Sequence, residues 1–189
     1  MDPVQSLKDA SALFRSRLEQ VPADGWERST PCSEWDVRAL VSHVVGGEKV
    51  VPELMAGKTF EELLPSLAGD QLGADPLAAF EAATAAAIDA FASPTALDRL
   101  VHHPAGDMDG RTYIGFRIGD LTVHSWDLAR ATGGDESLPL PLVEAVLAAL
   151  EPLRPVIGSV GVFGTGPSGS LSDDADPQTR MLDLAGRRP

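Results

Sequence analysis

Residues 30–47 read TPCSEWDVRALVSHVVGG, and this stretch combines a helix start with an apolar stripe. Ser33 to Asp36 has the residue types of a capping box, which predicts that Ser33 caps a helix with Asp36 in its first turn. Apolar residues then recur at the spacing of one helix face, at Val37, Leu40, Val41 and Val44. His43 lies at the flank of that face. The stretch therefore predicts an amphipathic helix that carries a histidine beside its buried side.

Further helices are predicted on both sides of this stretch. The long ones run from Pro3 to about Pro22, from Pro76 to Phe91, from Arg111 to Thr132 and from Pro139 through Leu150. Short helices are expected at 60–67 and 178–184, and 100–110 is expected to be a loop with a little extended structure. Gly46-Gly47 leaves open whether the helix after Asp36 ends there or continues. No strand-like alternation extends over six residues, so the sequence predicts an all-α fold, a four-helix bundle.

Length and composition limit the organisation and the partners of the chain. We expect the bundle to occupy 1–155 of the 189 residues. Residues 156–189, rich in Gly, Ser, Asp and Pro, are expected to form an irregular C-terminal segment with a short helix, packed on or trailing the same domain. The formal net charge of −13 would repel phosphate backbones, so we expect no nucleic-acid partner.

The same sequence predicts a cytoplasmic protein. No apolar run approaches the roughly 18 residues of a membrane span, so we expect no membrane association. No basic stretch and apolar block precede the first helix, so we expect no export signal. Cys32 is the only cysteine, which excludes an internal disulfide and a zinc site built from several thiolates.

Asp120 and His124 lie four residues apart on one predicted helix, so their side chains share a face. The simpler interpretation is a carboxylate–imidazole pair at a partly wet helix edge. The alternative is a divalent-metal site completed by His43 from a facing helix, because two imidazoles and one carboxylate form an open catalytic ligand set. Three protein ligands would leave a position for water or substrate. Zinc suits these ligands best, and nickel, iron and manganese remain open.

Three stretches resemble a known family: residues 30–47, GDLTVHSWDLARATG at 119–133 and DPQTRMLDLAGR at 176–187. They resemble the DinB-like metal-binding bundles, and more narrowly the group related to the N-terminal domain of mycothiol-dependent maleylpyruvate isomerase. The resemblance implies a four-helix bundle whose metal ligands are His43, Asp120 and His124. It also implies a small-molecule thiol such as mycothiol as cosubstrate and a small electrophile as its target.

The chain differs from the isomerase in two respects. The isomerase has glutamate where this chain has the shorter Asp120, and its bundle is followed by a second domain that we expect to be absent here. Isomerase activity is therefore not transferred by analogy. Our hypothesis is a metal-dependent thiol transferase or isomerase, with no catalytic residue assigned. The alternative is a non-enzymatic bundle that binds a metal or small ligand in regulation or stress response. A homodimer would be indicated by an exposed apolar helix edge, which periodicity alone does not reveal.

Other side chains are weaker candidates. Cys32 is interpreted as a structural part of its turn, with a helix-stabilised thiolate as the alternative. His102 and His103 are interpreted as a solvated pair, with one of them facing the metal as the alternative. Asp127 and Arg130 are expected to be partners behind the ligands or at the helix end, because metal-bound imidazoles donate their other N–H to a carboxylate or carbonyl.

Overall fold

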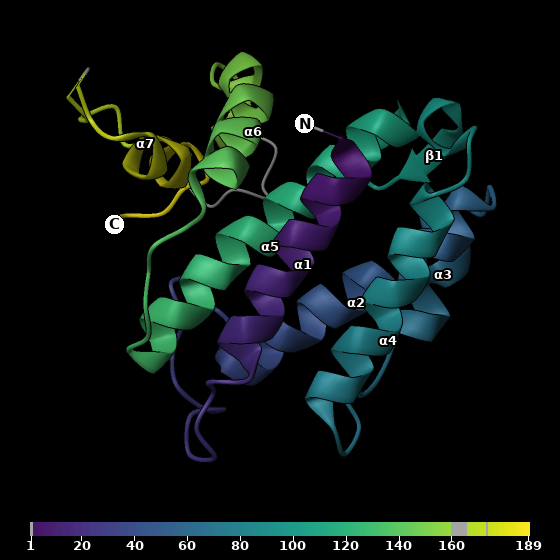
Figure 1. Ribbon diagram of the computed structural model, residues 1–189, viewed down its shortest axis with the longest axis horizontal. Helices are drawn as coiled ribbons and strands as arrows, with labels where there is room; N and C mark the ends of the chain where they lie inside the picture. Colours follow the sequence, from purple (N-terminus) through teal and green to yellow (C-terminus); the bar gives the residue numbers. More distant parts are fainter. Residues whose placement is uncertain (1, 160–165, 173) are drawn as a thin grey trace. The chain divides into compact units, whose positions relative to one another are not determined.

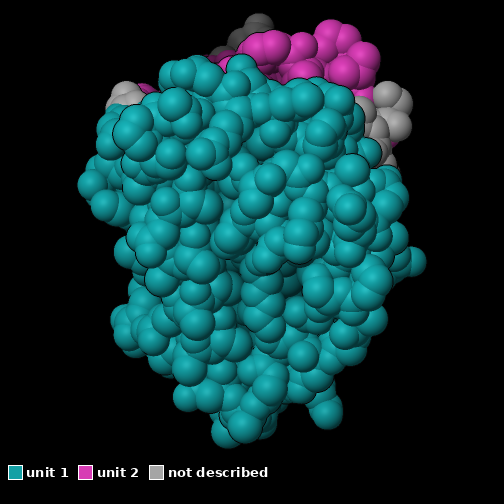
Figure 2. Space-filling model, turned by 90° about the vertical axis from the view of Figure 1, so that its right-hand side faces the viewer, with its two compact units in different colours: residues 1–134 teal, residues 135–189 magenta. Residues whose placement is uncertain are grey.

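The computed structural model describes residues 2–159, 166–172 and 174–189. The chain forms two compact units, Met1–Gly134 and Asp135–Pro189, which Figure 2 colours teal and magenta. The domain ranges expected from the sequence, 1–155 and 156–189, stay a prediction. Part of the expected loop over 158–176, namely residues 160–165 and 173, lies outside the described residues.

Four long helices build the bundle of the first unit (Figure 1), and they are α1 (Pro3–Leu18), α2 (Val37–Met55), α4 (Pro76–Phe91) and α5 (Gly110–Thr132). Helix α1 packs against α5, and α2 packs against both α4 and α5. The predicted all-α bundle is confirmed. Because α2 and α5 are neighbours, residues far apart in sequence can meet between them.

Shorter elements complete the first unit. Helix α3 (Phe60–Leu67) follows α2, as the sequence predicts. A 3-10 turn, η1 (Ala96–Asp98), leads into the antiparallel hairpin of β1 (Leu100–His103) and β2 (Gly106–Asp109), in which His103 pairs with Gly106. The region expected to be a loop with some extended structure is thus a short hairpin directly before α5.

The core of the first unit is formed by the apolar faces of its helices. Phe14 of α1 and Phe80 of α4 are both buried, and their ring centroids lie 5.0 Å apart. The apolar face of α2 continues past Gly46-Gly47 through Val51 and Leu54, both buried, so the helix does not end at the glycines. Burial of this continued stripe outweighs the weak helix propensity of glycine.

The predicted capping box at the start of α2 is wrong. Asp36, not Ser33, is the N-cap, and its Oδ1 accepts from the amide of Ala39 at 2.8 Å. The preceding residues form a closed turn, in which the hydroxyl of Thr30 donates to the carbonyl of Trp35 at 2.8 Å and the amide of Trp35 donates to the carbonyl of Cys32 at 2.9 Å. These bonds keep Ser33 in the turn and delay the helix to Val37.

The second unit contains α6 (Leu140–Leu150) packed against α7 (Pro177–Leu184), with 3-10 turns η2 (Glu151–Leu153) and η3 (Ile157–Ser159) after α6. The side-chain amide of Gln178 donates to the carbonyl of Glu136 at 2.9 Å and so ties α7 to the start of the unit. Among the described residues, no helix has both the length and the apolar character that a membrane crossing requires.

Candidate metal centre

The structure brings together the three side chains that the sequence singles out as metal ligands. His43 lies on α2, while Asp120 and His124 lie one turn apart on α5. One ligand atom from each residue lies within 4.8 Å of the other two. The packing of α2 on α5 therefore brings His43 next to the pair on α5, although they are far apart in the sequence.

Two carboxylate–imidazole distances within this group are long for charge-assisted hydrogen bonds. Asp120 Oδ1 lies 3.4 Å from His43 Nε2 and 3.3 Å from His124 Nε2. Charge-assisted N–H···O bonds are shorter, about 2.7–2.9 Å. Ligand atoms bound at about 2.1 Å around a tetrahedral zinc ion lie about 3.4 Å apart. The two distances from Asp120 Oδ1 are thus close to the edge of such a tetrahedron, and one ligand atom of each histidine lies within 4.8 Å of the other.

The three side chains differ in their access to solvent. The side chain of His124 is 7% exposed, that of Asp120 22% and that of His43 39%. The ring of Trp35 packs on His43 and His124, with centroid distances of 4.6 and 5.9 Å. The group is therefore anchored in the core at His124 and reachable from solvent at His43.

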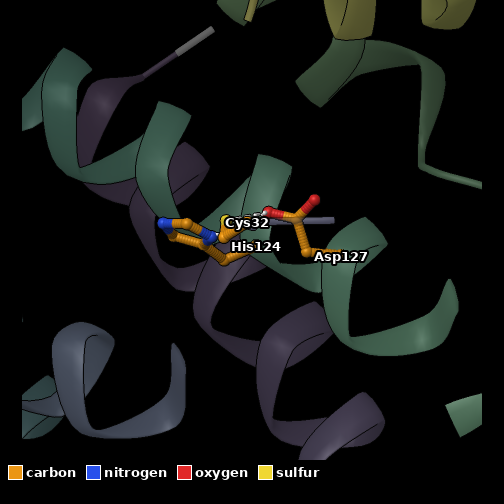
Figure 3. A group of neighbouring side chains, drawn as sticks. All are labelled: Cys32, His124 and Asp127. Carbon is orange, nitrogen blue, oxygen red and sulfur yellow. Dashed lines mark hydrogen bonds and ion pairs between the residues drawn. The ribbon is translucent and has the colours of Figure 1, made fainter. Parts of the chain in front are cut away.

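A second group meets the other edge of the same imidazole (Figure 3). The Nδ1 atom of His124 lies 2.9 Å from Oδ2 of Asp127, whose side chain is fully buried. Cys32 Sγ donates to the same carboxylate oxygen at 3.5 Å. Asp127 is expected to be a partner of a metal-bound imidazole, and its contact with His124 is consistent with that role. Cys32, interpreted as part of a turn, also contacts the core carboxylate, which sequence spacing did not indicate.

The charges of the site shift the pKa values of its residues. Burial by itself raises the pKa of Asp120, but the positive charge of Arg117, followed by those of the two histidines, outweighs burial and holds that pKa well below its usual range. Burial also lowers the pKa of His124, but the negative charge of Asp120 and hydrogen bonds raise it well above the usual value. The two shifts share one cause, because attraction between the Asp120 carboxylate and the His124 imidazole favours the charged form of each.

One buried ion pair beside the site was not predicted from the sequence. Glu48 on α2 is fully buried and binds Arg117 of α5, whose side chain is 10% exposed. Burial raises the pKa of Glu48, and Arg117 partly offsets that effect. Arg117 precedes Asp120 by three residues, which places them on one helix face, but nothing in the local sequence marks Glu48 as its partner.

The remaining candidates lie outside both groups. His102 pairs through Nδ1 with the exposed Asp107 at 2.8 Å. His103 stacks on Phe116 with a centroid distance of 5.5 Å, and burial lowers its pKa. The guanidinium of Arg130 lies 4.3 Å from the ring centroid of Trp126, a cation–π contact on the last turns of α5.

The fold and the paired helices that carry the site define the class of this chain as a DinB-like helical bundle. Within that class, the chain belongs to the mycothiol maleylpyruvate isomerase N-terminal domain family, whose model matches residues 7–129. Two uncharacterized proteins from two strains of Mycobacterium tuberculosis are each 35% identical to it over 174 residues, or 92% of this chain and 88% of each relative. The crystal structure of the mycothiol-dependent maleylpyruvate isomerase is similar, with a TM-score of 0.62 and 14% identity over 79% of this chain and 68% of the isomerase chain. That similarity shows a shared fold.

Proposed function

We propose that this chain binds a divalent metal ion, preferably zinc, through His43, Asp120 and His124. The metal-loaded chain would then use a mycothiol-type thiol in one of two reactions, either transferring the thiol to a small electrophile or isomerising that electrophile. The observation that carries the proposal is the spacing between Asp120 Oδ1 and the two imidazoles. Asp120 Oδ1 lies 3.3–3.4 Å from one nitrogen of each histidine, which is about the edge of a zinc tetrahedron.

Each residue of the site has a role in this proposal. Asp127 accepts from Nδ1–H of His124 and so leaves Nε2 as the ligand atom. The exposed side of His43 would let a small thiol reach an ion held by the three residues, while the ring of Trp35 covers one face of that imidazole. When bound, a divalent cation supplies Lewis-acid chemistry that lowers the pKa of a thiol reaching it.

Family membership supports the thiol part of the proposal. The family model carries mycothiol and maleylpyruvate isomerase in its description, and the similar crystal structure is of a mycothiol-dependent enzyme. The open side at His43 favours an enzyme over a non-enzymatic metal-binding bundle, because a catalytic metal site keeps one position open. The proposal retains the cytoplasmic location expected from the sequence.

The function is tested by thiol-dependent consumption of small electrophiles. The chain is stripped of metal, reloaded with Zn²⁺ and assayed against an electrophile panel with and without mycothiol. We expect consumption that requires both the thiol and Zn²⁺ and that is lost in His43→Ala. His102→Ala is the matched control, because it removes an exposed imidazole that lies outside the site. Zinc binding without any thiol-dependent turnover would instead favour the non-enzymatic bundle.

A further inference from the structure

The guanidinium of Arg117 connects the buried carboxylate of Glu48 with the partly exposed carboxylate of Asp120. Oε1 of Glu48 accepts hydrogen bonds from Nε and Nη2 of Arg117 at 3.0 and 2.9 Å. The same Nη2 lies 3.1 Å from Oδ2 of Asp120. That contact is an ion pair without the alignment of a hydrogen bond, and Oδ2 of Asp120 accepts no hydrogen bond from the described residues. Arg117 therefore faces one oxygen of Asp120 while the other oxygen faces the two histidines.

The position of the guanidinium depends on Gly47. A Cβ atom at position 47 would lie 2.7 Å from Nη2 and 2.9 Å from Nη1 of Arg117. Gly47 lies inside α2 and has no positive φ, so its backbone conformation does not require glycine. The close approach of Arg117 does require it, because any side chain would displace the guanidinium from its place between Glu48 and Asp120.

Glu48 balances a charge that would otherwise oppose cation binding. An unpaired guanidinium 3.1 Å from Asp120 would repel a metal ion bound to the other oxygen of that carboxylate. Glu48 is fully buried and supplies the opposite charge from the facing helix. The arginine can thus orient the carboxylate without adding net positive charge beside the proposed metal position.

We propose that Glu48 and Arg117, held against Gly47, are positioning residues that orient Asp120 Oδ1 toward the metal and set the metal affinity. This inference rests on the proposed metal-binding function. It assigns a role in metal binding to residues of α2 and α5 that donate no ligand atom to the metal. Partners behind metal ligands typically change metal affinity by about 10- to 100-fold when they are replaced.

The test compares two glycine-to-alanine variants loaded with Co²⁺ alone. Gly47→Ala changes no charge and no ligand, but its Cβ displaces the guanidinium of Arg117. Gly115→Ala is the matched control on α5, because a Cβ there has no neighbour within 4 Å. We expect Gly47→Ala to bind Co²⁺ about 10- to 100-fold more weakly than the wild type and to shift the visible absorption bands at saturation. Gly115→Ala should match the wild type in both.

The spectrum at saturation separates positioning from a merely structural role, because a lower folded fraction reduces band intensity without moving the bands. Glu48→Gln is a second variant that leaves the backbone unchanged and removes the balancing charge. We expect it to weaken Co²⁺ binding to a similar degree. Wild-type affinity and wild-type bands in both variants would overturn the positioning role while leaving the metal site intact. A wild-type chain that binds no Co²⁺ would overturn the metal-binding function, and this inference with it.

Discussion

His124 and Asp127 are joined by a 2.9 Å contact between Nδ1 and Oδ2, on the opposite edge of the imidazole from Asp120. Both side chains are buried. Because one ring nitrogen is held by Asp127, the other is directed at Asp120 and His43. The two edges of a single imidazole therefore link a core carboxylate to the candidate ligand group.

Replacing Asp127 by asparagine should weaken metal binding. The variant keeps the side-chain volume but loses the charge that orients His124 and raises the basicity of its ring, so we expect about a 10- to 100-fold loss of Zn²⁺ affinity. Competition with a chromophoric chelator measures the Zn²⁺ affinity of the wild type and the variant. Asp9→Asn, on the exposed face of α1, is the control for loss of an acidic charge. An unchanged affinity in Asp127→Asn would show that the carboxylate has no influence on the ligand.

Metal affinity should rise with pH across the neutral range. The raised pKa of His124 means that its imidazole keeps a proton at pH values where an ordinary histidine, with a pKa of about 6.5, has lost it. A metal ion must displace that proton, so binding releases protons and weakens as the pH falls. Calorimetry in buffers of different ionisation enthalpy measures the number of protons released when the metal binds. A Zn²⁺ affinity that stays constant between about pH 6 and pH 8 would contradict this assignment.

Trp35 should report metal binding by its fluorescence. Its ring packs on both candidate histidines, so a paramagnetic ion such as Co²⁺ bound there should quench its emission. Trp35→Phe should remove most of the quenching seen on titration. Trp26→Phe is the control, because Trp26 makes no ring contact with either histidine among the described residues. Equal quenching in wild type and Trp35→Phe would place the bound ion elsewhere.

The start of α2 should depend on Asp36 and not on Ser33. Asp36→Ala removes the side-chain acceptor for the amide of Ala39, and we expect a loss of about 1 kcal/mol in the free energy of unfolding. Ser33→Ala should change it by much less, because Ser33 lies in the preceding turn. Urea denaturation of the metal-free chain measures both. A larger loss of unfolding free energy for Ser33→Ala than for Asp36→Ala would contradict the N-cap at Asp36 and support the capping box predicted from the sequence.

Local patterns predicted most of the helices and the pair on α5. Asp-Pro at 75–76, the apolar stripe after it and glycine at 133 are short-range signals, and the structure places α4 and the end of α5 there. The spacing of Asp120 and His124 is equally local. The turn before α2 was misjudged because Asp36 and Ser33 are both good caps, and the choice depends on hydrogen bonds made by Thr30.

The rest of the site depends on contacts between residues far apart in the chain. Glu48 and Arg117 are separated by 69 positions and Cys32 and Asp127 by 95, and neither pair has a periodic signal. The packing of α2 and of the turn before it on α5 brings both pairs together. A sequence can therefore indicate which residue types bind a metal, while the residues that orient those ligands are visible only in the fold.

X-ray absorption spectroscopy of the zinc-loaded chain, without added thiol, tests the central claim most directly. We expect one zinc per chain, with nitrogen and oxygen ligands at about 2.0–2.2 Å and the outer-shell scattering of two imidazoles. Cys32→Ser should give the same spectrum, because the cysteine lies on the Asp127 side of His124. A sulfur ligand at about 2.3 Å, or the absence of bound zinc, would contradict coordination by His43, Asp120 and His124.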